Sequence, residues 1–408
     1  MLLLYNLGVQ FYFILIWVAS HFNKKANLWI KGRKNVKYKH FDKSAWFHFA
    51  SLGEYEQGLP VLSSYRAQYP SIPIVITFFS PSGYEIRKNT PYADAVYYLP
   101  LDTAANAQHF INAINPTIAV FTKYEYWYHY FNELNRANVP LFVISGIFRP
   151  GQIFFKWYGG LHRRMLGFVT RFFVQDEESK TLLQQINITN VTVSGDTRFD
   201  RVWANAESPK LLPMIAEFKH GHKILVAGST WPEDEALLAQ LVKENPNWKF
   251  IIAPHEINDE KINKLVALLP LVSAERYSQV SNLKSDIINH NVLIIDNIGM
   301  LSSLYQYGDI AYIGGGFGVG IHNTLEAAAF GLPVIFGPNY QRFKEAKYLV
   351  TIQSGFCINN ADELKKAFLF LTEDENRYQN ISQKTKLYVQ EHTGATEIIM
   401  GSINQVSI

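Results

Sequence analysis

The sequence predicts an α/β protein with two parallel, doubly wound sheets that follow one another along the chain. Short apolar runs of strand length alternate with stretches of helical composition over nearly the whole sequence. The alternation is interrupted by a polar, proline-bearing stretch at residues 206–221, and then restarts with a new apolar run. A length of 408 residues is sufficient for two domains of ordinary size. We therefore expect one domain over residues 23–202 and another over residues 203–408, whose C-terminal helix is a candidate for packing back on the first domain.

The chain opens with an apolar segment that carries no charged side chain in residues 1–20. About 20 apolar residues span a bilayer core, but Asn6, Gly8 and Gln10 interrupt this run. The segment therefore predicts either a poor transmembrane helix or an interfacial one rich in aromatic residues. A signal peptide is disfavoured, because no basic residue precedes the apolar run. We expect residues 1–22 to anchor the chain to a membrane.

A basic cluster follows directly: residues 21–43 hold eight lysine and arginine residues against one acidic residue, Asp42. Positive charge after an apolar segment keeps the downstream chain in the cytoplasm and attracts anionic lipid headgroups. The whole chain has a net charge of only +3, and no basic face of the kind that binds nucleic acid is expected. A single cysteine, Cys357, excludes a disulfide framework and a cysteine-cluster metal site.

The elements in order support this organisation. In the first domain the expected strands are AWFHFAS (45–51), PIVITFF (73–79), AVYYLP (95–100), IAVFT (118–122) and PLFVISG (140–146), with helices between them, one of them KYEYWYHYFNELNRAN (123–138). The stretch FFVQDEESKTLLQQ (172–185) supplies a further strand and helix, and VTVSGDTRFDRV (191–202) closes this half. In the second they are KILVAGS (223–229), KFIIAPH (249–255), VLIID (292–296), IAYIGG (310–315) and PVIFG (333–337). Ligands of such sheets bind outside the carboxyl ends of the strands. We therefore expect the functional residues in the loops that follow the strands.

Two loops of the first domain carry carboxylates. Ser51 and Glu54 follow the first strand, with the spacing of a capping box, in which Ser51 caps the helix and Glu54 bonds back. The alternative is that Glu54 is a general base that takes the proton of an attacking hydroxyl. Glu125 follows the fourth strand next to Lys123; it is a second candidate, or an acidic residue at a solvated helix start.

The second domain carries the features of a nucleotide site. Glycines at 314–320 lie between a strand and a predicted helix, LEAAAFG, and such a loop can present N–H groups to an anion. Glu326 in that helix can accept hydrogen bonds from a ribose. Ser229 and Thr230 can hold phosphate, or form an ordinary helix start. His255 is a lone histidine, and since no HExxH-like spacing joins it to His290 or His322, we expect no metal.

These motifs together resemble the transferases of 3-deoxy-D-manno-oct-2-ulosonic acid (Kdo) in the lipopolysaccharide pathway. The resemblance extends over nearly the whole chain and rests on MLLLYN at the start, S-x-G-E at Ser51–Glu54, T-x-x-S-P-S-G at Thr77–Gly83, E-x-W at Glu125–Trp127, G-D-T-R-F-D at Gly195–Asp200, S-T at Ser229–Thr230, D-x-x-G at Asp296–Gly299, G-x-H-N-x-L-E at Gly320–Glu326 and Gly337-Pro338. It implies a GT-B fold and an inverting transfer of Kdo from CMP-Kdo to the lipid A precursor that needs neither a metal nor a cofactor. It also implies that the protein works at the cytoplasmic face of the inner membrane, in contact with the lipids of that membrane.

The resemblance also implies roles for the residues. Glu54 is the expected general base and Glu125 supports the acceptor side, where Ser80, Ser82, Gly83, Lys123 and Arg149 are the expected acceptor-binding residues. The CMP-sugar residues are expected to be Ser229, Thr230, His255, Gly315, Gly316, Gly318, His322, Asn323 and Glu326. The first domain is then acceptor-binding and the second binds the CMP-sugar.

Several positions depart from the family pattern. Lys123 replaces the first Glu of E-x-E-x-W, Met300 stands where Glu is common, and Pro254 is followed by His255-Glu256 instead of Arg-His. An arginine expected to face the phosphate is therefore missing, with Arg198 or Lys347 as candidate substitutes. The alternatives are a GT-B glycosyltransferase with another nucleotide sugar, or a non-catalytic nucleotide-binding protein on the membrane. An oxidoreductase is disfavoured, because no acidic residue ends the strand after the glycine loop.

Overall fold

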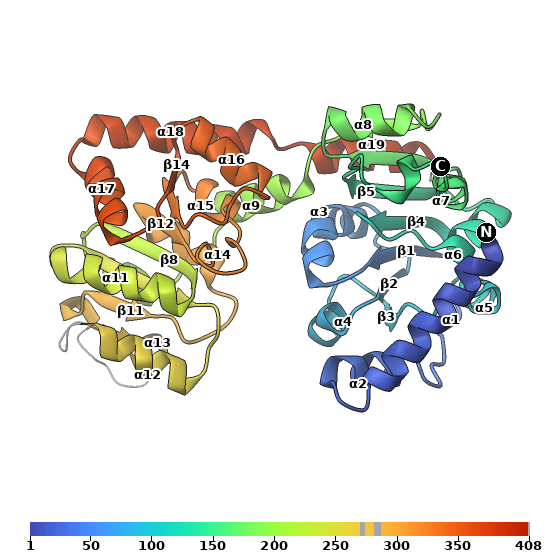
Figure 1. Ribbon diagram of the computed structural model, residues 1–408, viewed down its shortest axis with the longest axis horizontal. Helices are drawn as coiled ribbons and strands as arrows, with labels where there is room; N and C mark the ends of the chain where they lie inside the picture. Colours follow the sequence, from blue (N-terminus) through green and yellow to red (C-terminus); the bar gives the residue numbers. More distant parts are fainter. Residues whose placement is uncertain (270–273, 281–286, 407–408) are drawn as a thin grey trace. The chain divides into compact units, whose positions relative to one another are not determined.

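The computed structural model describes residues 1–269, 274–280 and 287–406, and the chain divides into two compact units. The first comprises Met1–Arg201 together with the chain from His392 onward, and the second is Val202–Glu391. Figure 1 shows the C-terminal helix α19 (Ala395–Val406) within the first unit, where Ile399, Met400 and Ile403 join the apolar core next to α3.

The first unit is built on a seven-stranded parallel sheet in the order β3-β2-β1-β4-β5-β6-β7. The strands are β1 (Ser44–Phe49), β2 (Ile74–Phe78), β3 (Ala95–Tyr98), β4 (Pro116–Thr122), β5 (Leu141–Gly146), β6 (Arg171–Val174) and β7 (Val191–Val193). The helices are α1 (Leu2–Ala19), α2 (Lys24–Lys31), α3 (Leu52–Gln68), α4 (Pro81–Arg87), α5 (Ala104–Ile114), α6 (Tyr128–Arg136), α7 (Gly160–Leu166), α8 (Glu177–Gln184) and the start of α9 (Thr197–Glu207).

The strands are continuous apolar runs because helices cover both faces of the sheet. All six residues of β1 are buried: Trp46 belongs to the core on one face, and Ala45 and Phe47 belong to the core on the other. Side chains of a strand alternate between the faces, so a doubly covered strand has no position for an exposed polar residue. The strand order reverses between β1 and β4, which marks the point where ligands of such sheets bind.

The second unit has the same architecture, with a parallel sheet in the order β10-β11-β9-β8-β12-β13-β14. The strands are β8 (Ile224–Thr230), β9 (Lys249–Pro254), β10 (Ala274–Arg276), β11 (Val292–Ile294), β12 (Ile310–Ile313), β13 (Val334–Phe336) and β14 (Gly355–Cys357). The helices are α10 (Pro213–Lys219), α11 (Pro232–Glu244), α12 (Asp259–Leu268), α13 (Tyr277–Val280), α14 (Leu301–Leu304), α15 (Leu325–Ala328), α16 (Lys344–Thr351), α17 (Ala361–Thr372) and α18 (Glu375–Glu391). The edge strands β10 and β14 escape prediction, because each has only three residues, most of them half-buried, and so gives too weak a pattern.

Two predicted helices are shorter than expected. The helix expected from Lys123 begins only at Tyr128, because Lys123 has the left-handed φ of +62° and Trp127 is extended. Glu125 therefore lies in a loop, and the prediction of a helix start at this residue is wrong. The helix after the glycine loop is reduced to Leu325–Ala328, although Gly331 does take a left-handed φ of +79° just beyond it.

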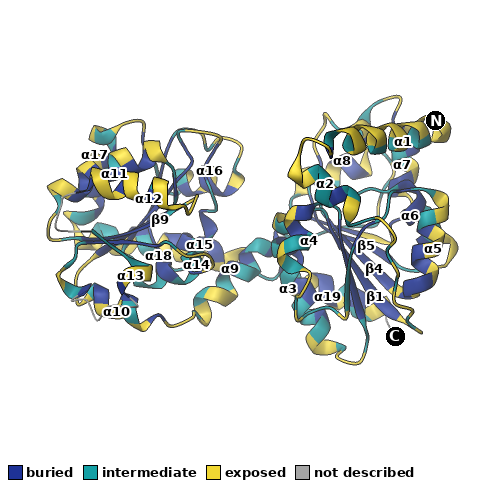
Figure 2. Ribbon diagram, turned by 90° about the horizontal axis from the view of Figure 1, so that it is seen from below, coloured by how far each residue is buried: buried dark blue, intermediate teal, exposed yellow. Residues whose placement is uncertain are grey.

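Helix α1 lies on the surface of the first unit with most of its side chains exposed (Figure 2). It is 18 residues long with a mean hydropathy of 1.8, so its length and composition suit a membrane-crossing helix. Two polar contacts fix its first turn: the Tyr5 hydroxyl donates to Asp102 at 2.5 Å, and Asn6 Oδ1 lies 2.7 Å from His129 Nε2.

The basic cluster after α1 divides into two kinds of residue. Its seven lysines are exposed, but Arg33 is largely buried, donating to the carbonyls of Leu99 and Phe79 at 2.7 Å each and lying 3.8 Å above the Trp29 ring. Burial lowers the pKa of Arg33 to about 9, which still leaves it charged at neutral pH. Arg33 therefore fastens α2 to the loops after β2 and β3, and only the lysines remain for a charged surface.

Candidate active site

Polar side chains gather at the carboxyl edge of the first sheet, on both sides of the point where the strand order reverses. They are Glu54 after β1, Ser80 and Ser82 after β2, Lys123 and Glu125 after β4, and Arg149 after β5. Because all strands of this sheet are parallel, these loops share one edge. The expected catalytic carboxylates thus come from neighbouring strands, β1 and β4.

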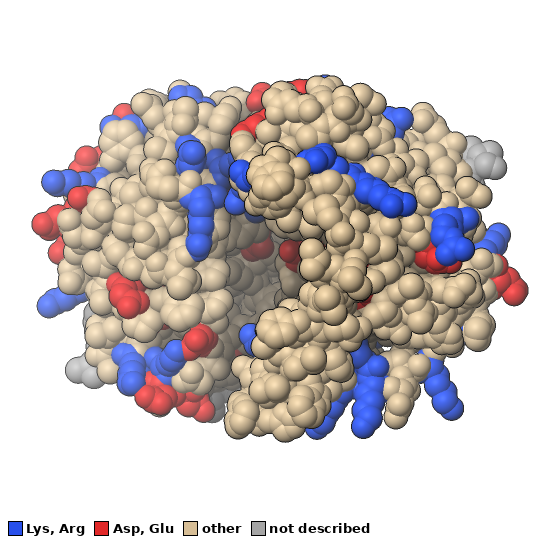
Figure 3. All heavy atoms as spheres, turned by 45° about the vertical axis from the view of Figure 1, so that its right-hand side comes forward, with Lys and Arg blue, Asp and Glu red and all other residues tan. Residues whose placement is uncertain are grey.

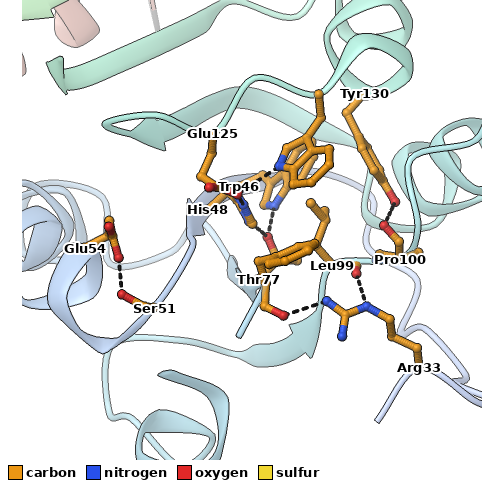
Figure 4. A network of polar contacts seen from close by, with 12 residues as sticks. Arg33, Trp46, His48, Ser51, Glu54, Thr77, Leu99, Pro100, Glu125 and Tyr130 are labelled. Carbon is orange, nitrogen blue, oxygen red and sulfur yellow. Dashed lines mark hydrogen bonds and ion pairs between the residues drawn. The ribbon is translucent and has the colours of Figure 1, made fainter. Parts of the chain in front are cut away.

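Glu54 lies in the first turn of α3, half-buried, with the Ser51 hydroxyl donating to its carboxylate (Figure 4). The expected capping box is not formed, because the Ser51 side chain caps no backbone N–H of α3. A helix start favours a charged carboxylate. The carboxylate is oriented by Ser51 through one oxygen, so the geometry suits acceptance of a proton at the other.

Glu125 is held from behind by a chain of buried side chains (Figure 4). Trp127 Nε1 donates to Glu125 Oε2 at 3.0 Å, and His48 Nε2 lies 3.2 Å from the same oxygen. His48 Nδ1 lies 2.8 Å from the Thr77 hydroxyl, which also accepts from Trp46 Nε1 at 2.8 Å. Since a carboxylate only accepts, the neutral His48 ring carries its proton on Nε2, facing Glu125, and Nδ1 then accepts from the Thr77 hydroxyl.

The expected acceptor residues have different structural roles. Gly83 is buried against Phe78, where a Cβ atom would come within 2.3 Å of the ring, so it allows α4 to approach β2 closely. Ser80 caps α4 by accepting from Ser82 N at 3.3 Å. Arg149 is exposed after β5. Of these residues, Arg149 and the Ser80 and Ser82 hydroxyls offer polar groups to a ligand at this edge.

In the second unit, the glycine loop is locked to the start of α11 by a buried carboxylate, Asp234. It accepts from Gly315 N at 2.9 Å, from the Tyr312 hydroxyl at 2.7 Å and from Trp231 N at 2.9 Å. Burial raises the pKa of Asp234, although these three donors act in the opposite direction. The N–H group of Gly315 is thus occupied within the protein, and Gly318 N likewise donates to the Gly315 carbonyl at 3.1 Å.

Three aromatic side chains stack beside this loop. The rings of Trp231 and His255 are 4.7 Å apart at 22°, and those of His255 and His322 are 4.5 Å apart. Burial, and then the neighbouring His255, lower the pKa of His322 to about 4. Trp231 Nε1 donates to His322 Nε2 at 3.3 Å, so neutral His322 carries its proton on Nδ1. The three rings form an aromatic surface at the end of β8 and β9.

The remaining donor-site candidates lie around that stack. Ser229 has a left-handed φ of +55° at the end of β8, but the Thr230 hydroxyl is buried and donates to Glu235 at 3.0 Å. Asn323 Nδ2 donates to Glu326 Oε1 at 3.1 Å, and its Oδ1 accepts from Leu325 N, which fixes both side chains at the start of α15. Gly316 lies in tight contact with Gly337, where a Cβ atom would be 2.5 Å from the backbone.

Comparison with known proteins identifies the relatives of this chain. Residues 22–201 match the family model described as 3-deoxy-D-manno-octulosonic-acid transferase (kdotransferase). A 3-deoxy-D-manno-octulosonic acid transferase of Chlamydophila psittaci is 28% identical over 361 residues, covering 85% of this chain and 81% of the relative. One from Haemophilus influenzae is 27% identical over 371 residues, covering 87% and 85%.

The chain belongs to the Kdo transferase family. It is therefore a glycosyltransferase, as its motifs predict. Among solved structures, a UDP-GlcNAc 2-epimerase of Neisseria meningitidis superposes with a TM-score of 0.62 at 16% identity, covering 89% of this chain and 100% of that chain. A glycosyltransferase of Rickettsia africae superposes with 0.57 at 13% identity, covering 90% and 98%. These likenesses confirm the predicted GT-B fold.

One cation of this Kdo transferase escapes prediction from the sequence. The exposed guanidinium of Arg342 lies against Gly320, which has a left-handed φ of +126°, and donates to the carbonyl of Val319. Of the substitutes expected from the sequence, Arg198 instead forms an ion pair with Asp196, 2.7 Å away. Lys347 is exposed on α16. No motif singles out Arg342, because 21 residues of chain, 321–341, separate it from the glycine loop that it contacts.

Within the described ranges 1–269, 274–280 and 287–406, no group of three or more His, Cys, Asp and Glu side chains could hold a metal ion. Buried Asp234 and His48 are further residues that sequence reasoning missed, and Thr77 was noted only as the first residue of the T-x-x-S-P-S-G motif. Asp234 and His48 carry no motif of their own, and only the fold brings them next to predicted residues.

Proposed function

We propose that this Kdo transferase moves Kdo from CMP-Kdo to a lipid A precursor, with inversion at the anomeric carbon, on the cytoplasmic face of the inner membrane. The observation that carries the proposal is the pairing of Glu54 with Ser51 at the edge where the strand order of the first sheet reverses. The relatives, which are 3-deoxy-D-manno-octulosonic acid transferases, support the sugar, and the family resemblance supports the donor and acceptor.

In the proposed reaction, Glu54 takes the proton of the acceptor hydroxyl as that oxygen attacks the anomeric carbon. The bond from this carbon to the phosphate oxygen breaks, and CMP leaves with the electron pair. A positioned carboxylate contributes on the order of 10²–10⁴-fold to such a step. The sugar passes through a cation-like state, as in glycoside hydrolysis. Glu125, fixed by His48 and Trp127, orients the acceptor from the neighbouring strand.

For the donor, we assign the ribose to Glu326, which Asn323 holds in place, and the base to the ring surface of His255 and His322. The phosphate is assigned to Ser229 and the loop around Gly316, with Arg342 as the cation. Donors and cations aimed at the leaving phosphate stabilise its charge as the bond breaks. Arg342 thereby replaces the arginine that is missing beside His255.

The lipid acceptor gives a reason for the N-terminal segment. We assign α1 to the membrane interface, where its exposed apolar side chains meet lipid and the seven lysines after it meet anionic headgroups. Each such lysine contributes about 1 kcal/mol near an anionic surface. Figure 3 shows a broad uncharged surface, with Lys and Arg side chains projecting beside it.

The test is transfer itself, with purified protein, CMP-Kdo and a tetraacylated lipid A precursor, followed by mass spectrometry of the lipid. A gain of one or more Kdo masses is expected. If folded protein binds CMP but adds no sugar, another nucleotide sugar becomes the better hypothesis, and CMP-Kdo is exchanged for UDP-sugars. If it binds nucleotide yet transfers nothing from any donor, the transfer proposal is refuted and a non-catalytic binding role remains.

A further inference from the structure

An apolar cavity of about 310 Å³ lies between α1 and the loops that follow β2, β3 and β4. Helix α1 contributes Tyr5, Gly8, Val9 and Tyr12, and the facing wall includes Phe79 and Trp127. This volume is within the range of small-molecule sites. The whole cavity lies in the first unit, and none of the acceptor residues predicted from the sequence lines it.

The cavity exists because α1 is fixed at one end and lacks a side chain in its middle. The bonds from Tyr5 to Asp102 and from Asn6 to His129 hold the first turn against the start of α6. One turn later comes Gly8, where a Cβ atom would meet no heavy atom within 4 Å. A larger residue at this position would occupy the space, so Gly8 keeps the cavity open.

The walls suit a hydrocarbon and not a sugar or nucleotide. Asp102 is the one carboxylate among the lining residues, and its oxygens already accept from the Tyr5 hydroxyl and from the backbone N–H groups of His129 and Tyr130. A polar ligand without hydrogen-bond partners would lose its hydration at a cost that apolar walls cannot offset. Outside the cavity, Leu4, Phe11 and Leu15 of α1 are exposed, so apolar surface continues outward along the helix.

One wall of the cavity also belongs to the predicted active site. Trp127 lines the cavity and donates through Nε1 to Glu125 Oε2 at 3.0 Å. Phe79 stacks on Trp127, with ring centroids 5.1 Å apart at 27°. An apolar chain in the cavity would therefore end within one side chain of a carboxylate assigned to the acceptor.

We propose that this cavity binds one acyl chain of the lipid acceptor and so positions its sugar headgroup at Glu125. The inference rests on the proposed function, since it names a subsite for the acceptor of that reaction. The chain enters from the apolar side of α1, while its headgroup stays at the polar edge of the sheet. Each methylene removed from water contributes about fourfold to affinity, so a few methylenes in the cavity suffice for a marked acyl preference.

The test fills the cavity. Gly8→Phe places a ring in the open space, whereas the control Gln10→Phe adds the same ring at an exposed position about 200° around the same helix. Transfer is measured in detergent with two acceptors, the tetraacylated precursor and its fully deacylated sugar. For Gly8→Phe, we expect KM for the acylated acceptor to rise roughly tenfold, because the ring would displace about two methylenes of the acyl chain from the cavity. KM for the deacylated acceptor should stay the same. Gln10→Phe should match the wild type with both.

Three results would overturn the inference. These are an unchanged KM in Gly8→Phe, an equal loss with both acceptors, or a loss confined to vesicle binding, which would assign the cavity to a bilayer lipid. If the wild type transfers to neither acceptor, the proposed function fails, and binding of dansyl-undecanoate decides separately on the cavity. Gly8→Phe should then lower the affinity for dansyl-undecanoate roughly tenfold, and Gln10→Phe should leave it unchanged. Equal affinity in both variants refutes the assignment of the cavity as an acyl-chain site.

Discussion

The clearest energetic prediction concerns the hydroxyl of Thr77, which the structure places between Trp46 Nε1 and His48 Nδ1, 2.8 Å from each. All three side chains are fully buried. Thr77→Val keeps the shape but leaves a buried indole N–H and a ring nitrogen without a partner. An unpaired buried polar group costs about 1–3 kcal/mol, so we expect the first unit to lose about 2–4 kcal/mol.

The chain provides a matched control at the end of β4. The Thr122 hydroxyl is equally buried, but it has no hydrogen-bond partner among the residues that the structure describes. Thr122→Val therefore removes an unpaired hydroxyl, and stability should stay the same or rise by up to about 1 kcal/mol. Urea denaturation followed by circular dichroism and tryptophan fluorescence measures both. Equal losses in the two variants would refute the assignment of the Thr77 bonds.

Three further predictions test the second unit and the N-terminal segment. Arg342→Ala should weaken CMP binding about tenfold in calorimetry and Arg342→Lys should recover part of it; unchanged affinity removes Arg342 from the phosphate site. The pKa of His322 is lowered to about 4 from an unfolded value of 6.5, so the unfolded chain binds the extra proton between these values. Stability should therefore fall by about 1 kcal/mol from neutral pH to roughly pH 5, allowing for partial exposure, and His322→Asn should lose that dependence in urea titrations. Deleting residues 1–20 should leave a folded protein that sediments less with anionic vesicles; undiminished binding contradicts the role of α1.

The sequence was sufficient for the architecture because a doubly covered parallel strand has a distinct pattern. Runs such as those of β1 and β12 are entirely buried, so apolar residues fill every position and loop residues follow at once. The strands β10 and β14 lack that pattern, since each has only three residues and most of them are half-buried. Their existence depends on the sheet already being present.

The site was predictable only where residues follow a strand in a motif. Glu54 and Glu125 stand in the loops and turns that follow buried strands, and His322 stands at the end of the glycine loop after β12, so strand prediction brings all three to the sheet edges. The residues that hold these side chains in place were not predictable. His48 lies inside a strand and is indistinguishable from a core residue, and Arg342 meets the glycine loop only after the chain folds back. The cavity at Gly8 needs the docking of α1, which the sequence presents only as an apolar segment.

The most direct measurement of the central claim compares wild type and Glu54→Gln in one preparation, by initial rate of Kdo transfer and by CMP affinity. Gln keeps the size of the side chain but cannot take a proton at neutral pH. The account predicts a fall in rate of at least roughly 10²-fold with CMP affinity unchanged, because Glu54 belongs to the first unit and the donor residues to the second. Ordinary turnover by Glu54→Gln would contradict the assignment of Glu54 as the general base.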